Sequence, residues 1–140
     1  MYAVLLFLPK ISMTSIFLYK HCAFFALPLL ANLSQISDRT RQDLSDAMES
    51  APKQTVRQRI AMMREFTIDE TKLQQISQPV LLIGSEKDLI LPSVAEANRL
   101  AKIFPQATVV TLPHSGHACL VEKDINLYQI MEANNFVPKR

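Results

Sequence analysis

In Pro79-Val80-Leu81-Leu82-Ile83-Gly84-Ser85-Glu86-Lys87-Asp88, a fully apolar run ends at a glycine and passes into a polar turn. A short apolar run with such a boundary is typical of a strand buried on both faces of a parallel sheet. A second β-rich run, Ala107-Thr108-Val109-Val110-Thr111-Leu112, leads into the loop Pro113-His114-Ser115-Gly116-His117. Together the two runs predict neighbouring strands of one sheet.

A helix is predicted between the two strands, because Pro92 and Ser93 are typical of a helix start and Pro105 of its end. A final helix is predicted over roughly Asp124 to Ala133, with apolar residues facing the core. The order strand, helix, strand, helix indicates an α/β protein with a βαβ unit, a right-handed crossover and a trailing helix.

The first half of the chain is expected to be mainly helical. Val56, Ile60 and Met63 recur at helical spacing and predict an amphipathic helix over roughly Thr55 to Phe66. Before it, the polar stretch Ser37–Asp43 begins with a good N-cap residue, and Pro52 interrupts the segment.

Residues 1–33 are apolar, with Lys10 and Lys20 as their only formal charges. Three interpretations stay open: buried cap or lid helices over an acyl pocket, a segment on a membrane surface, or one tilted span interrupted by Lys20. The start of the chain lacks the basic region of a secretory signal. We therefore expect a cap-like or lid-like segment over residues 1–70 and the βαβα part over residues 71–140.

The composition narrows the class of protein. The 140 residues suffice for one domain, and 49% hydrophobic with 20% charged residues indicates a globular chain. A net charge of +2 without blocks of like charge gives no case for a nucleic-acid partner. The two cysteines form no disulfide framework or zinc motif, so we expect reduced thiols, no metal and no cofactor. The expected location is cytoplasmic, with membrane association left open.

Glycine is rare in this chain, which has only Gly84 and Gly116. A phosphate-binding loop, a dinucleotide fingerprint and a G-x-S-x-G nucleophile elbow all need glycines a few positions apart. None of these three motifs can therefore exist within these residues.

Asp88 and His117 are the candidate catalytic residues. Each follows the end of a predicted parallel strand, and loops at neighbouring strand ends meet at one edge of the sheet. A carboxylate there could orient an imidazole that takes a proton from a serine. Each residue alone has a plainer interpretation, Asp88 as a turn or cap residue and His117 as a loop histidine. His114 is the competing base, but no glycine precedes it.

These residues resemble a known family, the α/β-hydrolases, in which the triad order along the chain is serine, acid, histidine. The resemblance covers roughly residues 77–136 and lies in the strand, in the turn to Asp88 with Pro92 after it, and in Ser115-Gly116-His117-Ala118 followed by Glu122. The helix Arg57–Phe66 and the phrase Leu91-Pro92-Ser93 resemble one branch more closely. That branch is the plant and cyanobacterial esterase, lipase and thioesterase group that includes the phytyl ester synthases.

The resemblance implies the C-terminal portion of a hydrolase sheet that carries the triad acid and base, with the serine elbow upstream. We therefore expect a fragment of a serine hydrolase or acyltransferase of acyl esters or thioesters that is inactive alone. The branch's H-x-x-x-x-D acyltransferase motif is absent, so that chemistry does not carry over. The alternative is a non-catalytic membrane-surface or interaction protein that complements another chain.

Overall fold

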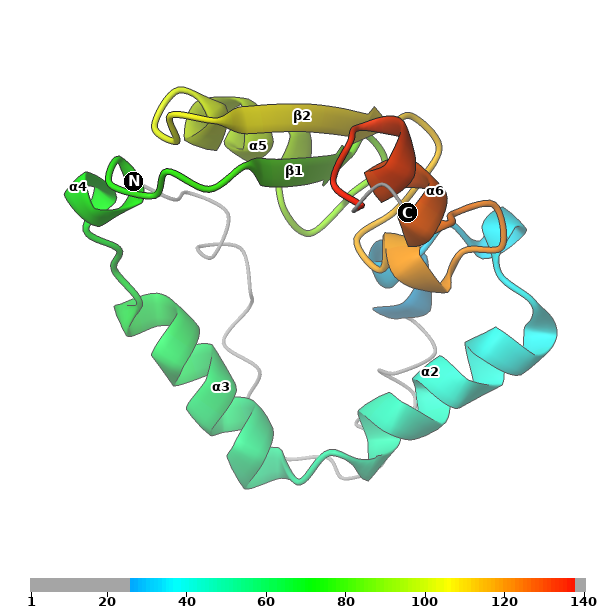
Figure 1. Ribbon diagram of the computed structural model, residues 1–140. Coiled ribbons are helices and arrows are strands. Elements are labelled where there is room, and N and C mark those ends of the chain that lie inside the picture. Colours follow the sequence, from blue (N-terminus) through cyan, green and yellow to red (C-terminus); the bar gives the residue numbers. More distant parts are fainter. Residues whose placement is uncertain (1–25, 138–140) are drawn as a thin grey trace.

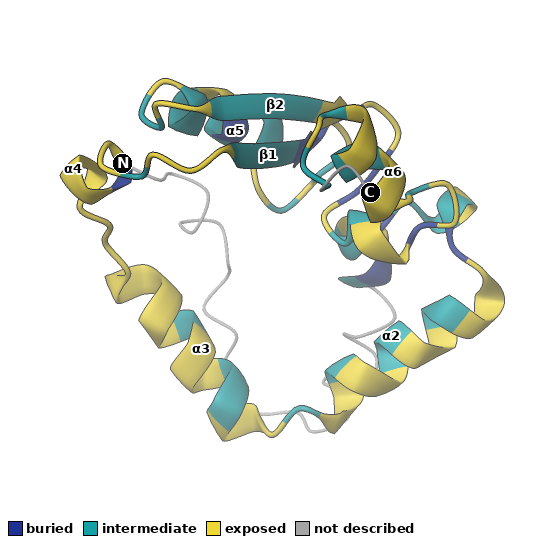
Figure 2. Ribbon diagram, in the orientation of Figure 1, coloured by how far each residue is buried: buried dark blue, intermediate teal, exposed yellow. Residues whose placement is uncertain are grey.

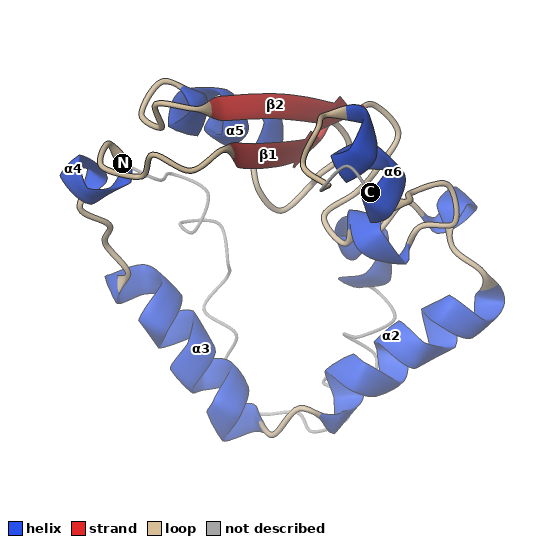
Figure 3. Cartoon of the chain, in the orientation of Figure 1, coloured by secondary structure: helices blue, strands red, loops and turns tan. Residues whose placement is uncertain are grey.

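The computed structural model describes residues 26–137 of the chain (Figure 1). Helices dominate the part before the sheet, and one helix separates the two strands (Figure 3). After a short helical turn over residues 26–30, the elements in chain order are η2 (Leu33–Gln35), α2 (Asp38–Ser50), α3 (Lys53–Glu65), α4 (Glu70–Leu73), β1 (Val80–Ser85), α5 (Ser93–Ala101), β2 (Ala107–Leu112), η3 (Cys119–Val121) and α6 (Leu127–Ala133).

The predicted βαβ unit is confirmed. β1 and β2 pair in parallel, from Val80 opposite Ala107 to Ser85 opposite Leu112. Helix α5 connects them and packs on both strands. It begins after Pro92 and buries Ala97, and Lys102 caps its C-terminal end through its backbone N–H. The α/β class of the chain follows from this arrangement.

The strands are less covered than the sequence predicts. Val80–Ile83 were expected to be buried on both faces, but they are only half-buried, and burial is complete only at Gly84 and Ser85. The reason is that α5 is the main element packed on the sheet among the described residues. The buried apolar residues of this part of the chain are few: Leu27, Ala31, Ile36, Leu73, Ala97 and Leu112.

Helices α2 and α3 extend away from the sheet like the two arms of a V (Figure 1). Ser37 caps α2 by accepting a hydrogen bond from the Thr40 N–H at 3.1 Å, as its sequence position predicts. Pro52 is the last residue of the short connection between α2 and α3. Helix α3 begins at Lys53, two residues before the expected start. Neither helix buries a residue (Figure 2).

The boundary of the last helix was wrong in the sequence prediction. Helix α6 begins at Leu127 and not near Asp124. The cause is local, because the Asn126 side chain accepts a hydrogen bond from the Gln129 N–H at 3.1 Å and so acts as the N-cap. The short helix α4, capped by Asp69, was not predicted.

Only the end of the apolar segment 1–33 lies within the described residues. Leu27 and Ala31 are buried, and so is Ile36 just beyond the segment. The Ala118 N–H donates to the Leu30 carbonyl at 2.6 Å, so this segment lies on the loop after β2. No helix of residues 26–137 is long and apolar enough to cross a membrane. The three interpretations of residues 1–33 concern mainly residues 1–25, which lie outside the described residues.

Candidate active site

The parallel register of the sheet determines where the candidate site forms. β1 and β2 end side by side at Ser85 and Leu112, and the loops that carry Asp88 and His117 leave the same edge. The Glu86 N–H extends the ladder to the Leu112 carbonyl at 3.0 Å, and the Lys87 N–H donates to the Ser115 carbonyl at 3.0 Å. Backbone hydrogen bonds therefore join the two loops, independently of the Asp88 and His117 side chains.

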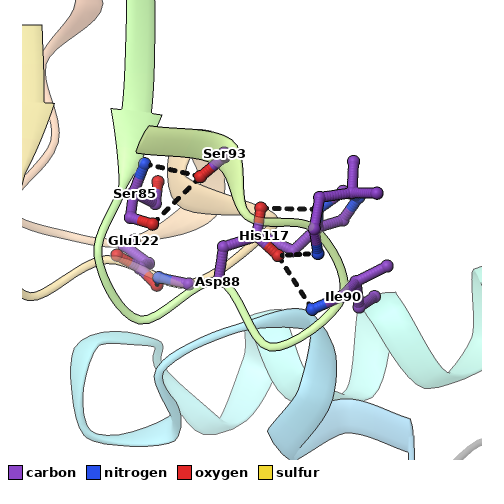
Figure 4. Close-up of polar contacts among 8 residues, drawn as sticks. Ser85, Asp88, Ile90, Ser93, His117 and Glu122 are labelled. Atoms are coloured by element: carbon purple, nitrogen blue, oxygen red, sulfur yellow. Dashed lines mark hydrogen bonds and ion pairs between the residues drawn. The ribbon is translucent and has the colours of Figure 1, made fainter. Parts of the chain in front are cut away.

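Asp88 and His117 lie within hydrogen-bonding distance. The Nδ1 atom of His117 is 3.0 Å from Oδ2 of Asp88 (Figure 4). The Asp88 side chain is 4% exposed, whereas the His117 side chain is 35% exposed. The ring atom Nε2 of His117 has no hydrogen bond to any residue between 26 and 137. One face of the pair is thus buried and the other is open.

The second oxygen of Asp88 explains the charge state of the pair. Oδ1 accepts hydrogen bonds from the Ile90 and Leu91 N–H groups, each at 2.9 Å. Burial alone would raise the pKa of Asp88, but the hydrogen bonds from Leu91, His117 and Ile90 outweigh it and hold the pKa below its usual value. The carboxylate is therefore ionised at neutral pH and can only accept, so Nδ1 of His117 carries the proton.

The two glycines stand where backbones approach each other. A Cβ on Gly84 would lie 2.8 Å from the Val94 Cα, and a Cβ on Gly116 would lie 2.9 Å from the Ala31 Cα. Neither glycine has a positive φ. Steric space alone requires glycine at both turns.

Ser93 joins the end of β1 to the start of α5. Its Oγ accepts from the Ser85 N–H at 2.9 Å and donates to the Ser85 carbonyl at 2.9 Å (Figure 4). Both backbone groups of Ser85 are thereby satisfied at the point where the chain turns toward Asp88. The sequence marked Ser93 only as a helix-start residue, and the side-chain bridge could not be read from it.

Glu122 is a second residue whose place the sequence did not reveal. Its Oε1 atom accepts hydrogen bonds from the Gly116 N–H at 2.9 Å and from the Asn32 N–H at 3.0 Å. The residue is only 3% exposed. Glu122 was recognised as part of the family signature, but nothing in the sequence placed it against residue 32.

His114, the competing base, lies away from the pair. It is exposed, and its carbonyl accepts a hydrogen bond from Nδ2 of Asn32 at 2.7 Å. It lines a pocket of about 170 Å³ with Gln35, Glu122 and Ile125, and neither Asp88 nor His117 lines this pocket. Within residues 26–137 no cluster of His, Cys, Asp or Glu could hold a metal ion.

A strand-end carboxylate that orients a loop imidazole is the acid–base pair of hydrolases with an α/β sheet. A family model described as the alpha/beta hydrolase fold matches residues 12–124. The chain therefore belongs to the α/β-hydrolase family.

Three curated proteins that are similar to this chain are named for different activities. A protein of Acinetobacter baylyi named as a carbamate hydrolase, RutD, is 27% identical over 123 residues, which are 84% of this chain. Phytyl ester synthase 1 of Arabidopsis thaliana is 27% identical over 90 residues, 64% of this chain. The pimeloyl-[acyl-carrier protein] methyl ester esterase of Nitrosomonas europaea is 47% identical over 47 residues, 34% of this chain.

The chain spans less than half the length of each of these relatives: 44% of RutD, 13% of the synthase and 18% of the esterase. A crystal structure of a membrane phospholipase A, described as a bacterial virulence factor, superposes with a TM-score of 0.66 at 17% identity. That match covers 81% of this chain and 37% of the other. At this identity the likeness supports the fold alone.

Proposed function

We propose that this chain supplies the acid and the base of a serine hydrolase that acts on acyl esters or thioesters. The observation that carries the proposal is the 3.0 Å contact between the buried Asp88 carboxylate and Nδ1 of the half-exposed His117. The nucleophilic serine comes from polypeptide outside these 140 residues, because no G-x-S-x-G is possible within them.

The chemistry follows from the proton on Nδ1. The lone pair of the His117 Nε2 accepts the proton of the serine hydroxyl as Oγ bonds to the acyl carbon. The resulting imidazolium then donates that proton to the departing alkoxide or thiolate, and a serine ester remains. Water attacks this ester in turn, its proton passing to Nε2 and then to the serine. Asp88 stays ionised throughout and stabilises the cation.

The names of the relatives support an acyl substrate. One is named an ester synthase and another a methyl ester esterase, and both chemistries pass through an acyl carbonyl. Whether water or an alcohol accepts the acyl group depends on residues outside the pair. We propose an ester or thioester as the shared substrate class.

We also propose that residues 1–70 act as a cap-like segment of a cytoplasmic enzyme. Its described part contains α2 and α3, which extend away from the sheet. The exposed apolar residues Met62 of α3 and Phe66, directly after the helix, support a surface for apolar groups, whether an acyl chain or a membrane surface.

The test is to express this sequence together with the coding sequence directly upstream in the same frame, and to measure p-nitrophenyl ester hydrolysis. His117→Ala and Asp88→Asn should each lower kcat by roughly 10³-fold or more. His114→Ala is the matched control and should leave kcat within about twofold. Full activity of His117→Ala would contradict the proposal, and an upstream frame without G-x-S-x-G would favour the interaction role.

A further inference from the structure

The loop that presents His117 is bound by a carboxylate from further along the chain. Oε1 of Glu122 accepts the Gly116 N–H at 2.9 Å and the Asn32 N–H at 3.0 Å. Glu122 is 3% exposed, so the two N–H groups meet a charged acceptor inside the protein. Charge-assisted bonds of this kind are stronger than those between neutral groups.

The partner of this loop is a segment that we call the strap, residues 30–35. Besides the Glu122 bridge, three further hydrogen bonds join the strap to residues 114–123. The Ala118 N–H donates to the Leu30 carbonyl at 2.6 Å, and the Lys123 N–H donates to the Gln35 carbonyl at 2.8 Å. Asn32 Nδ2 donates to the His114 carbonyl at 2.7 Å. Strap and loop therefore form one bonded unit.

His117 lies at the centre of this unit. The N–H of the residue before it, Gly116, is bound by Glu122, and the N–H of the residue after it, Ala118, is bound by Leu30. Gly116 also rests directly on the strap, since a Cβ there would lie 2.9 Å from the Ala31 Cα. The backbone of His117 is thus fixed on both sides, and only the bond at Gly116 depends on a side chain, that of Glu122.

We propose that Glu122 is a positioning residue for His117, which keeps the ring against Asp88 by tying the histidine loop to the strap. That this positioning serves catalysis rests on the proposed function. The positioning itself does not, because the contact between His117 and Asp88 forms whether or not a serine is supplied. Among the described residues, no hydrogen bond joins the Glu122 side chain to Asp88 or His117.

The geometry predicts which substitutions Glu122 tolerates. Glu122→Gln keeps an oxygen at the position of Oε1 and can accept both N–H groups, although without the charge. Glu122→Asp keeps the charge but shortens the side chain by one methylene, so one oxygen can no longer reach both donors. Glu122→Leu removes the acceptor. The position of the oxygen should therefore matter more than the charge.

The test is amide hydrogen exchange at Gly116 and Asn32 in the 140-residue chain, together with the NMR signal of the proton on Nδ1 of His117. We expect Glu122→Gln to keep exchange within about threefold of the unsubstituted chain and to retain the ring signal. Glu122→Asp and Glu122→Leu should speed exchange at both amides by roughly tenfold to a hundredfold and broaden or remove the ring signal.

Glu132→Leu on the exposed surface of α6 is the matched control and should change neither readout. If Glu122→Leu does not fold, the contrast between the Gln and Asp variants decides. Unchanged amide exchange and an unchanged ring signal in Glu122→Asp would overturn the proposal. Fast exchange at both amides together with loss of the ring signal in a folded Glu122→Gln would also overturn it. A failed hydrolysis assay would overturn the proposed function and leave this result standing.

Discussion

At the scale of single residues, the site depends on one carboxylate that accepts three hydrogen bonds. Asp88 binds two backbone N–H groups through one oxygen and His117 through the other. These bonds favour the ionised form more than burial disfavours it, so the pKa of Asp88 lies below that of an unfolded chain. The same bonds define which nitrogen of His117 is protonated.

This lowered pKa predicts how Asp88 contributes to stability as the pH changes. A group whose pKa is lower in the folded state stabilises it above the unfolded pKa, about 3.9 for an aspartate, and loses that contribution as the pH falls through the folded value. The free energy of unfolding should thus fall more steeply below about pH 4 in the unsubstituted chain than in Asp88→Asn. Urea denaturation from pH 7 to pH 2 measures this, and parallel curves would refute it.

The glycines give a second prediction at the residue scale. Because neither has a positive φ, the cost of a side chain is steric alone. Gly84→Ala and Gly116→Ala should each lower the free energy of unfolding by about 1–3 kcal/mol, since the atoms that a Cβ would meet are backbone atoms. Urea midpoints of the two variants check this, with Ala133→Gly on α6 as a backbone control. A change below about 0.5 kcal/mol would show that the loops yield.

At the scale of elements, the strands and α5 could be predicted from the sequence because their ends are marked locally. Pro79 directly precedes β1 and Gly84 is its next-to-last residue, whereas Pro92 directly precedes α5, which ends at Ala101, before Pro105. The start of α6 was missed, because a side-chain cap at Asn126 decides it. The bridges of Ser93 and Glu122 were missed for another reason, since each joins positions whose proximity exists only after folding.

Helix α3 is the element whose sequence pattern and surroundings disagree. Its apolar pattern predicts a packed face, yet Met63 is 58% exposed and Phe66, the residue after the helix, is 72% exposed. We expect that Met63→Gln combined with Phe66→Gln changes the free energy of unfolding by less than about 0.5 kcal/mol but reduces self-association.

Sedimentation velocity across a concentration series, beside urea denaturation, measures both effects. Arg59→Gln with Arg64→Gln is the control on the polar positions of the same helix. A large loss of stability in the Met63 and Phe66 variant would show that this face packs within the chain.

At the scale of the whole molecule, the chain brings Asp88 and His117 into contact but contains no G-x-S-x-G sequence. The pairing of Asp88 with His117 could be predicted because parallel strands bring their carboxyl ends to one edge. The extent of burial could not, because it depends on which elements cover the sheet. The 140-residue chain alone should hydrolyse p-nitrophenyl esters no faster than buffer. Turnover that His117→Ala abolishes would contradict this.

The central claim is that Asp88 holds His117 with its proton on Nδ1 and its Nε2 lone pair open to a serine. The ring ¹⁵N chemical shifts of His117 in the folded chain test it most directly, because they distinguish the two neutral tautomers. The account predicts the Nδ1–H tautomer with a strongly downfield ring proton, and loss of that proton signal in Asp88→Asn. A dominant Nε2–H tautomer, or a ring signal that Asp88→Asn leaves unchanged, would contradict it.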